Sequence, residues 1–190
     1  MLNRLSKNIV VWLNKNKVIG EEEIGLYNYA VFCLLMKIIP LIIIIVISAF
    51  IGNVVGAVIL SWIFVSVRYC TGGYHAKTPL KCVFMSVLII GGTVVLCTYV
   101  TDINYVAQIC LLLWSVCNIL AKAPIDSPNR RLCDLEKVKL KRTTKLVLIV
   151  YLLFYAVALI NHKYNLEILF GIFWVSVMLY ERNNIDEKCH

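Results

Sequence analysis

The chain has 190 residues, of which 61% are hydrophobic and 16% are charged. A soluble protein has about 45–50% apolar and about 25% charged residues, and a small domain leaves too much surface in water to bury such an excess. This composition excludes a water-soluble globule and indicates an all-α integral membrane protein with one polytopic membrane domain over residues 1–190. The net charge of +8 does not predict nucleic acid as a partner, because the basic residues lie between apolar runs and do not form one face.

An amphipathic helix is predicted within residues 1–20. Apolar side chains recur there at helical spacing and polar residues take the opposite face, which is typical of helices that lie in the membrane surface. The apolar face contains Leu2, Leu5, Ile9, Trp12 and Leu13, and the polar face contains Arg4, Ser6, Lys7, Asn8 and Lys15. A cytosolic helix packed on the rest of the protein is the alternative. A signal peptide is not expected, since no long apolar core follows Met1.

Six apolar runs then predict transmembrane helices. They cover residues 29–51, 54–69, 82–100, 103–121, 146–160 and 166–180. The runs are continuously apolar, which favours helices over the alternating strands of a membrane barrel. The last two runs hold about 15 residues each, or roughly 22 Å of helix, which is less than a hydrocarbon core of about 30 Å. A four-span alternative therefore stays open.

The basic residues are distributed unevenly between the predicted loops. With six spans, every Lys and Arg falls on one side of the membrane except Lys37, which lies inside a span, and Lys163, which lies on the other side. Cytoplasmic loops retain Lys and Arg, so both termini are expected in the cytoplasm.

The connection between the second and third spans, residues 68–82, places a histidine near a cysteine at the end of an apolar helix. His75 and Cys82 are seven residues apart, so a straight helix would separate them by about 10 Å along its axis. Gly72 and Gly73 permit backbone angles closed to other residues, and Pro79 prevents a helix from running through from His75. A turn can therefore fold the imidazole back toward the thiol. We name residues 68–82 the predicted catalytic loop.

Cys82 is the predicted nucleophile. Thr78 and Pro79 are typical of a helix N-cap and a first helical residue, which puts Cys82 near the end of the first turn of the third span. The positive helix end and nearby cations favour a thiolate. These cations are Arg68, Lys77 and Lys81. The predicted reaction is attack of the thiolate on a peptide carbonyl, with His75 taking the thiol proton and returning it to the leaving amine.

Each of these residues also has a structural interpretation. A histidine beside a cysteine at a membrane edge is often structural, the glycine pair can be a plain turn, and the three cations can be membrane-edge anchors. Cys70 is a competing nucleophile, but it lies at the C-terminal end of the second span, where the helix dipole disfavours an anion. No metal site is expected, because one histidine and scattered cysteines offer no paired ligand spacing.

A second basic segment, residues 121–145, is predicted to be a cytoplasmic loop between the fourth and fifth spans. Pro124 and Pro128 favour an ordered turn, in which Asp126 or Asn129 could orient the imidazole by a hydrogen bond. The basic surface would also attract an acidic peptide tail or anionic head groups, so membrane lipids are expected partners.

The chain resembles the AgrB (accessory gene regulator protein B) family of Gram-positive bacteria over essentially its whole length. The resemblance lies in an arginine, a glycine, a His-Ala pair and a cysteine between two apolar spans, and in a second-loop turn: Arg68, Gly73, His75-Ala76, Cys82, Ala123-Pro124 and Asn129. The chain has Asn129-Arg130-Arg131 where relatives often have Asn-Lys-Pro, so one proline of the family pattern is missing.

The resemblance implies a cysteine endopeptidase of the bacterial cell membrane. The implied substrate is a small AgrD-like propeptide with an amphipathic leader, a central signal sequence and an acidic tail. Cys82 would remove the tail and hold the remainder as a thioester, and an internal thiol or hydroxyl of the propeptide would then close a thiolactone or lactone ring. The product would be a quorum-sensing precursor. The resemblance also implies a homodimer, and the reaction requires no cofactor.

Two other classes of function are compatible with the sequence. In a peptide exporter or other transporter, His75 and Cys82 would line a polar path, but the spans hold few ionisable residues, mainly Lys37 and Glu167. In a structural membrane subunit, the loop chemistry would be accidental. Cleavage of a co-expressed propeptide distinguishes a protease from both.

Overall fold

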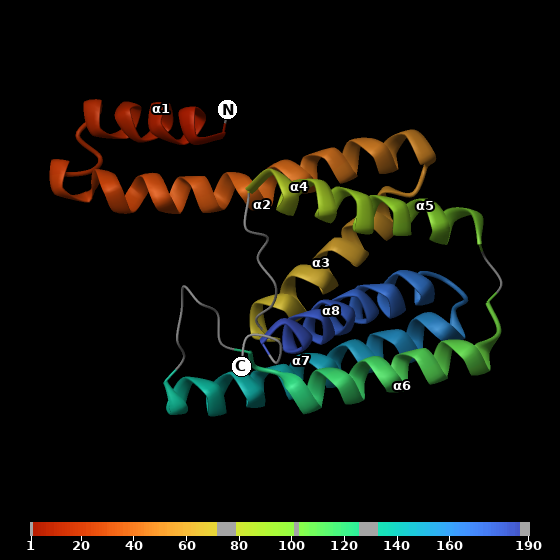
Figure 1. The fold of residues 1–190 in the computed structure, drawn as a ribbon. Helices are drawn as coiled ribbons and strands as arrows, with labels where there is room; N and C mark the ends of the chain where they lie inside the picture. The colour runs from red at the N-terminus through yellow and green to blue at the C-terminus, as the bar shows by residue number, and fades with distance from the viewer. Residues whose placement is uncertain (1, 72–78, 101–102, 126–132, 187–190) are drawn as a thin grey trace.

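The computed structural model describes residues 2–71, 79–100, 103–125 and 133–186, and side chains are described in these ranges except at residues 2, 79–82, 134 and 180–186. The described residues form helices and no strands, so the predicted all-α class is confirmed (Figure 1). The elements are α1 (Leu2–Lys15), η1 (Glu21–Glu23), α2 (Ile24–Ile51), α3 (Val54–Thr71), α4 (Pro79–Ser86), η2 (Val87–Gly91), α5 (Gly92–Tyr99), α6 (Tyr105–Lys122), α7 (Asp134–Ile160) and α8 (Asn165–Asp186).

All six predicted apolar runs coincide with helices in the described residues, except at Val100, Ile103 and Asn104. Four helical segments are long and apolar enough to cross a membrane, namely Glu21–Ile51, Val54–Thr71, Tyr105–Lys122 and Leu135–Ile160. Two shorter apolar segments, Val83–Tyr99 and Asn165–Leu179, correspond to the third and sixth predicted runs. These helices support a multi-pass membrane protein. The number of six spans and the cytoplasmic termini stay predictions.

The predicted start of the fifth helix is wrong. We expected a loop over residues 121–145, but α7 begins at Asp134 and continues through the basic stretch into the apolar run. A capping box explains the early start, since the Cys133 N–H donates to Glu136 Oε2 at 3.2 Å and the Cys133 side chain accepts from the backbone in return. The 27 residues of α7 measure about 40 Å, which exceeds a hydrocarbon core of about 30 Å. The basic first turns are therefore expected to extend beyond the membrane core.

Helices α3, α6, α7 and α8 form the main bundle (Figure 1). Close packing of α3 on α8 depends on Gly171, where an added Cβ would lie 2.9 Å from Ile63 Cγ2. The third predicted span, made of α4, η2 and α5, lies beside α2. This arrangement places the start of α4, which carries Cys82, against α2 and leaves α5 in contact with the bundle.

We expect Gly171→Ala to lower the free energy of unfolding by about 1–3 kcal/mol, because the new methyl group overpacks the contact between α3 and α8. Gly25→Ala is the matched control, since nothing lies within 4 Å of an added Cβ in that helix. The control should be neutral or stabilising by about 0.5–1 kcal/mol. Thermal unfolding of both variants in detergent measures the difference. Equal melting temperatures would contradict the packing argument.

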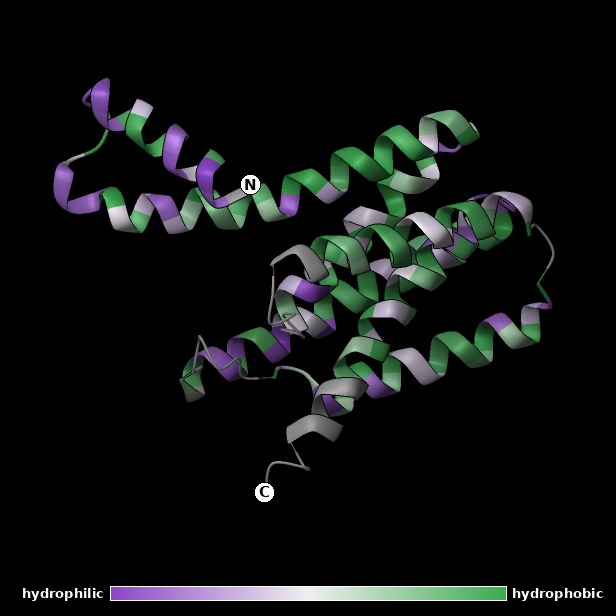
Figure 2. Cartoon of the chain, turned by 45° about the horizontal axis from the view of Figure 1, so that its top comes forward, coloured by the Kyte–Doolittle hydropathy of each residue, from purple (hydrophilic) through white to green (hydrophobic). Residues whose placement is uncertain are grey.

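Helix α1 lies beside the first half of α2, and this pair extends away from the bundle (Figure 1). The predicted helix within residues 1–20 is present, but it contacts α2 through buried Ser6 and Val10. The Ser6 hydroxyl donates to Asn28 Oδ1 at 2.9 Å. Leu5 and Trp12 of the predicted apolar face are exposed. Hydrophilic residues, purple in Figure 2, are frequent on α1 and in the turn before α2. The helix thus packs on the protein and still presents apolar side chains outward, where the membrane surface is predicted.

Cysteine labelling tests the predicted orientation. Cys133 is exposed immediately before α7, and Lys163 is exposed between α7 and α8. We expect a membrane-impermeant maleimide to label Lys163→Cys in intact cells, and to label Cys133 only after permeabilisation, because the two sites lie at opposite ends of α7. Peptide mapping identifies the labelled residue. Labelling of Cys133 in intact cells would show that the predicted orientation is wrong.

Candidate active site

The predicted catalytic residues lie partly outside the described residues. Gly72, Gly73, His75, Lys77 and Asp126 all fall there, so the predicted pairing of His75 with Cys82 stays a prediction. The backbone of Lys81 and Cys82 is described within α4, and their side chains are not. The described segments that carry or border these residues are α3, α4 and the chain that follows α6.

Helix α4 begins at Pro79, which confirms the predicted start. Proline is well suited to a first helical position because its fixed φ matches the helix and its missing N–H would have no partner there. Cys82 is the fourth residue of α4 and so belongs to its first turn. The unpaired N–H groups of a first turn and the helix dipole favour an anion at this end. This environment is the one that the proposed thiolate requires.

Arg68 is held in the last turns of α3. Its guanidinium carbon lies 5.6 Å from the centroid of the Phe64 ring, and Nη1 donates to Met178 Sδ at 3.6 Å. These contacts fix the side chain against α8, at the end of the helix that leads into the predicted catalytic loop.

Cys70 is a poor candidate for the nucleophile. Its side chain is only 6% exposed, and it lies in the last turn of α3, where the helix dipole disfavours a thiolate. Its backbone carbonyl accepts a hydrogen bond from Thr144 Oγ1 at 3.3 Å. The structure thus uses Cys70 to pack α3 against α7, which favours Cys82 over Cys70 as the reactive thiol.

Two hydrogen bonds hold the C-terminal end of α3 to later parts of the chain. One is the Thr144 bond to Cys70 O, and the other is donated by the Ile125 N–H to Thr71 O at 3.1 Å. Thr71 directly precedes the glycine pair in sequence, and Ile125 directly precedes Asp126. The predicted catalytic loop and the second predicted loop therefore lie next to each other at Thr71 and Ile125. The sequence reasoning missed Thr144 and this backbone contact, because a backbone hydrogen bond has no residue-type signature.

A buried polar cluster lies at the other ends of the helices. Glu167, at 6% exposure, accepts from Asn53 Nδ2 at 3.2 Å, and the same amide donates to Thr98 Oγ1 at 3.0 Å. Asn53 Oδ1 in turn accepts the N–H of Gly56. The cluster links the starts of α3 and α8 to α5. These hydrogen bonds make Glu167 a polar link between helices.

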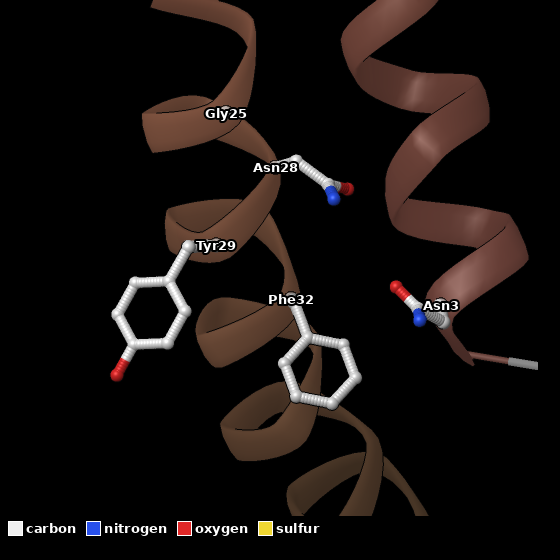
Figure 3. A pocket seen from close by; sticks show the side chains of 5 residues that line it. All are labelled: Asn3, Gly25, Asn28, Tyr29 and Phe32. Carbon is white, nitrogen blue, oxygen red and sulfur yellow. The ribbon is translucent and has the colours of Figure 1, made fainter.

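A pocket lies between α1 and α2, lined by Asn3, Gly25, Asn28, Tyr29 and Phe32 (Figure 3). The two amides come from facing helices, and the two aromatic rings belong to α2. The lining contains no thiol, carboxylate or imidazole. Apart from the Tyr29 phenol, the lining offers no group for acid–base or nucleophilic chemistry, and the candidate site remains the start of α4.

Comparison with known proteins identifies the family of the chain. Residues 6–179 match the Accessory gene regulator B family. The chain is also 24% identical over 165 residues to AgrB-like protein 1 of Clostridium perfringens (strain 13 / Type A), and the match covers 84% of this chain and 88% of that protein. No solved structure gave a significant match. The chain therefore belongs to the Accessory gene regulator B (AgrB) family, which takes part in processing the AgrD propeptide of agr quorum sensing.

Proposed function

We propose that the chain is a membrane cysteine endopeptidase that removes the C-terminal tail of an AgrD-like propeptide and closes the remainder into a ring. The position of Cys82 in the first turn of α4, in a chain of the AgrB family, carries the proposal. The burial of Cys70 supports it by disfavouring the competing thiol. The protein acts at the cytoplasmic edge of the bacterial cell membrane.

The reaction proceeds in two acyl transfers. His75 takes the proton of Cys82, and the sulfur attacks the carbonyl at the junction between the signal sequence and the tail. The C–N bond breaks, His75 gives its proton to the leaving amine, and the signal sequence stays on Cys82 as a thioester. A thiol or hydroxyl of the propeptide then attacks the thioester, its proton passes to the Cys82 sulfur, and the product leaves as a thiolactone or lactone. Exclusion of water at the lipid edge protects the thioester from hydrolysis.

Asp126 is the proposed positioning residue for His75. The Ile125–Thr71 hydrogen bond supports this role, because it holds the residue before Asp126 beside the residue before Gly72. A carboxylate next to an imidazole fixes its tautomer and stabilises the imidazolium that forms during proton transfer.

Charge and apolar surface at the same end of the molecule attract the substrate. The exposed cations of the first turns of α7 favour an acidic tail. They are Lys139, Lys141, Arg142 and Lys145. Exposed Leu5 and Trp12 on α1 favour the membrane surface in which an amphipathic leader would gather. Gathering the substrate at this surface raises its local concentration near Cys82.

The thioester provides a direct test. We expect proteoliposomes that contain the chain to release the tail from a synthetic propeptide, and to show in rapidly quenched samples a mass adduct of the tail-less peptide on Cys82. Hydroxylamine should remove this adduct, since it cleaves thioesters. An adduct on a different cysteine, or a propeptide that stays uncut, would overturn the proposal.

A further inference from the structure

The third span is not one regular α-helix. A π-helical turn, η2, covers Val87–Gly91 and separates α4, which carries Cys82, from α5. Such turns contain one extra residue within an α-helix and often occur at functional sites. Here the turn begins five residues after Cys82.

The extra residue sets the helical register of position 82. Ile90, Val94 and Cys97 are buried and mark the face of the span that packs on the protein. At about 100° per residue, an uninterrupted α-helix would place position 82 about 80° away from Ile90. Because the π-turn absorbs one residue, position 82 instead comes within about 20° of Ile90. The turn therefore keeps Cys82 in register with the buried face.

Two side chains hold this turn. The hydroxyl of Thr93 donates to Ile89 O inside the turn at 2.6 Å and accepts from Trp174 Nε1 at 2.8 Å. Thr93 is buried, and Trp174 lies on α8 among core residues. The turn also packs against α2 and α3, and α4 beyond it lies against α2.

We propose that Thr93 and Trp174 are positioning residues for Cys82, which act by holding the π-turn that keeps position 82 on the buried face. This inference rests on the proposed role of Cys82 as nucleophile. Without the hydroxyl, the segment relaxes toward a regular α-helix, and the start of α4 rotates by up to about 100° relative to α5.

Variants that each remove one partner of these hydrogen bonds test the proposal. We expect Thr93→Val and Trp174→Phe to slow alkylation of Cys82, because the rotation takes the sulfur away from the proposed base His75 and so lowers its thiolate fraction. Both variants should also lower kcat for propeptide cleavage by about tenfold, the factor for one lost buried hydrogen bond, with little change in KM. Thr93→Ser restores the hydroxyl and should stay within about twofold of the unaltered chain. Alkylation of Cys133, which is exposed before α7, serves as the internal reference for an intact fold. An equal slowing of both cysteines would overturn the proposal.

A deletion gives a second and independent test. Leu88 lies in the turn and is exposed, so its deletion removes the extra residue without emptying the core. Position 82 should keep its register, so Cys82 should stay reactive, and Thr93→Val should have no further effect in this background. Insertion of an alanine after Leu88 should abolish reactivity, because it turns position 82 by about 100°. Loss of Cys82 reactivity on deletion, or an equal Thr93→Val effect in both backgrounds, would refute the positioning role.

The two proposals fail in distinguishable ways. If the unaltered chain cleaves no propeptide, the proposed function is wrong, but the alkylation rates of Cys82 still measure whether the turn sets its register. If cleavage occurs and Thr93→Val leaves both readouts unchanged, only the positioning role is wrong.

Discussion

Cys82→Ala is expected to reduce propeptide cleavage by roughly four orders of magnitude or more, to the background rate. Without the sulfur no thioester can form, and the groups that remain can only bind the substrate. His75→Ala should cause a comparable loss, because the base has no role without the nucleophile and the nucleophile reacts slowly without the base. The double variant should therefore be no worse than either single variant, as is usual for residues that act as a unit. Single-turnover release of the tail in proteoliposomes measures all three rates.

Cys70→Ala is the matched control for this series. It removes the other thiol of the predicted catalytic loop, and this thiol is buried. We expect its cleavage rate to stay within about threefold of the unaltered chain once rates are normalised to folded protein, since Cys70 makes no bond to substrate. If Cys70→Ala loses cleavage and Cys82→Ala keeps full activity, the nucleophile is Cys70 and our assignment of Cys82 is wrong.

The sequence predicted the helices well because long apolar runs leave few alternatives in a membrane. The start of α4 was also predictable, since Pro79 marks a first helical position by its chemistry. The start of α7 was not, because the end of an apolar run marks the edge of the membrane core and not the end of the helix. Helical hydrogen bonds continue into water when the residues are good helix formers and a capping box such as Cys133 with Glu136 begins them.

The contacts between residues far apart in the chain could not be predicted from the sequence. The Trp174–Thr93 hydrogen bond joins residues 81 positions apart, and the Ile125–Thr71 bond uses only backbone atoms. Neither follows from helical periodicity, which orders residues within one element and says nothing about which elements meet. The π-turn was missed for a related reason, because its one extra residue leaves the apolar run continuous.

Asp126→Asn is expected to lower kcat for cleavage by about a hundredfold or more while leaving KM nearly unchanged. The amide keeps the size of the side chain but cannot stabilise the imidazolium, and it can hold the ring in the wrong tautomer. The limb of the pH–rate profile that reports the imidazole should also move to lower pH, because the charged ring loses its anionic partner. A residue with a purely structural role would not move that limb, so the profile separates positioning from folding.

Asp134→Asn is the control for the loss of one negative charge from the same connection. Asp134 begins α7, eight residues after Asp126, and has no proposed role in the reaction. Its cleavage rate and pH profile should match those of the unaltered chain.

Asn129 is the alternative orienting group that the sequence suggests, and Asn129→Ala tests it directly. If Asn129→Ala lowers kcat while Asp126→Asn does not, the orienting group is the Asn129 amide and the assignment to the Asp126 carboxylate is wrong. The Ile125–Thr71 hydrogen bond would still explain why the second loop lies next to the first.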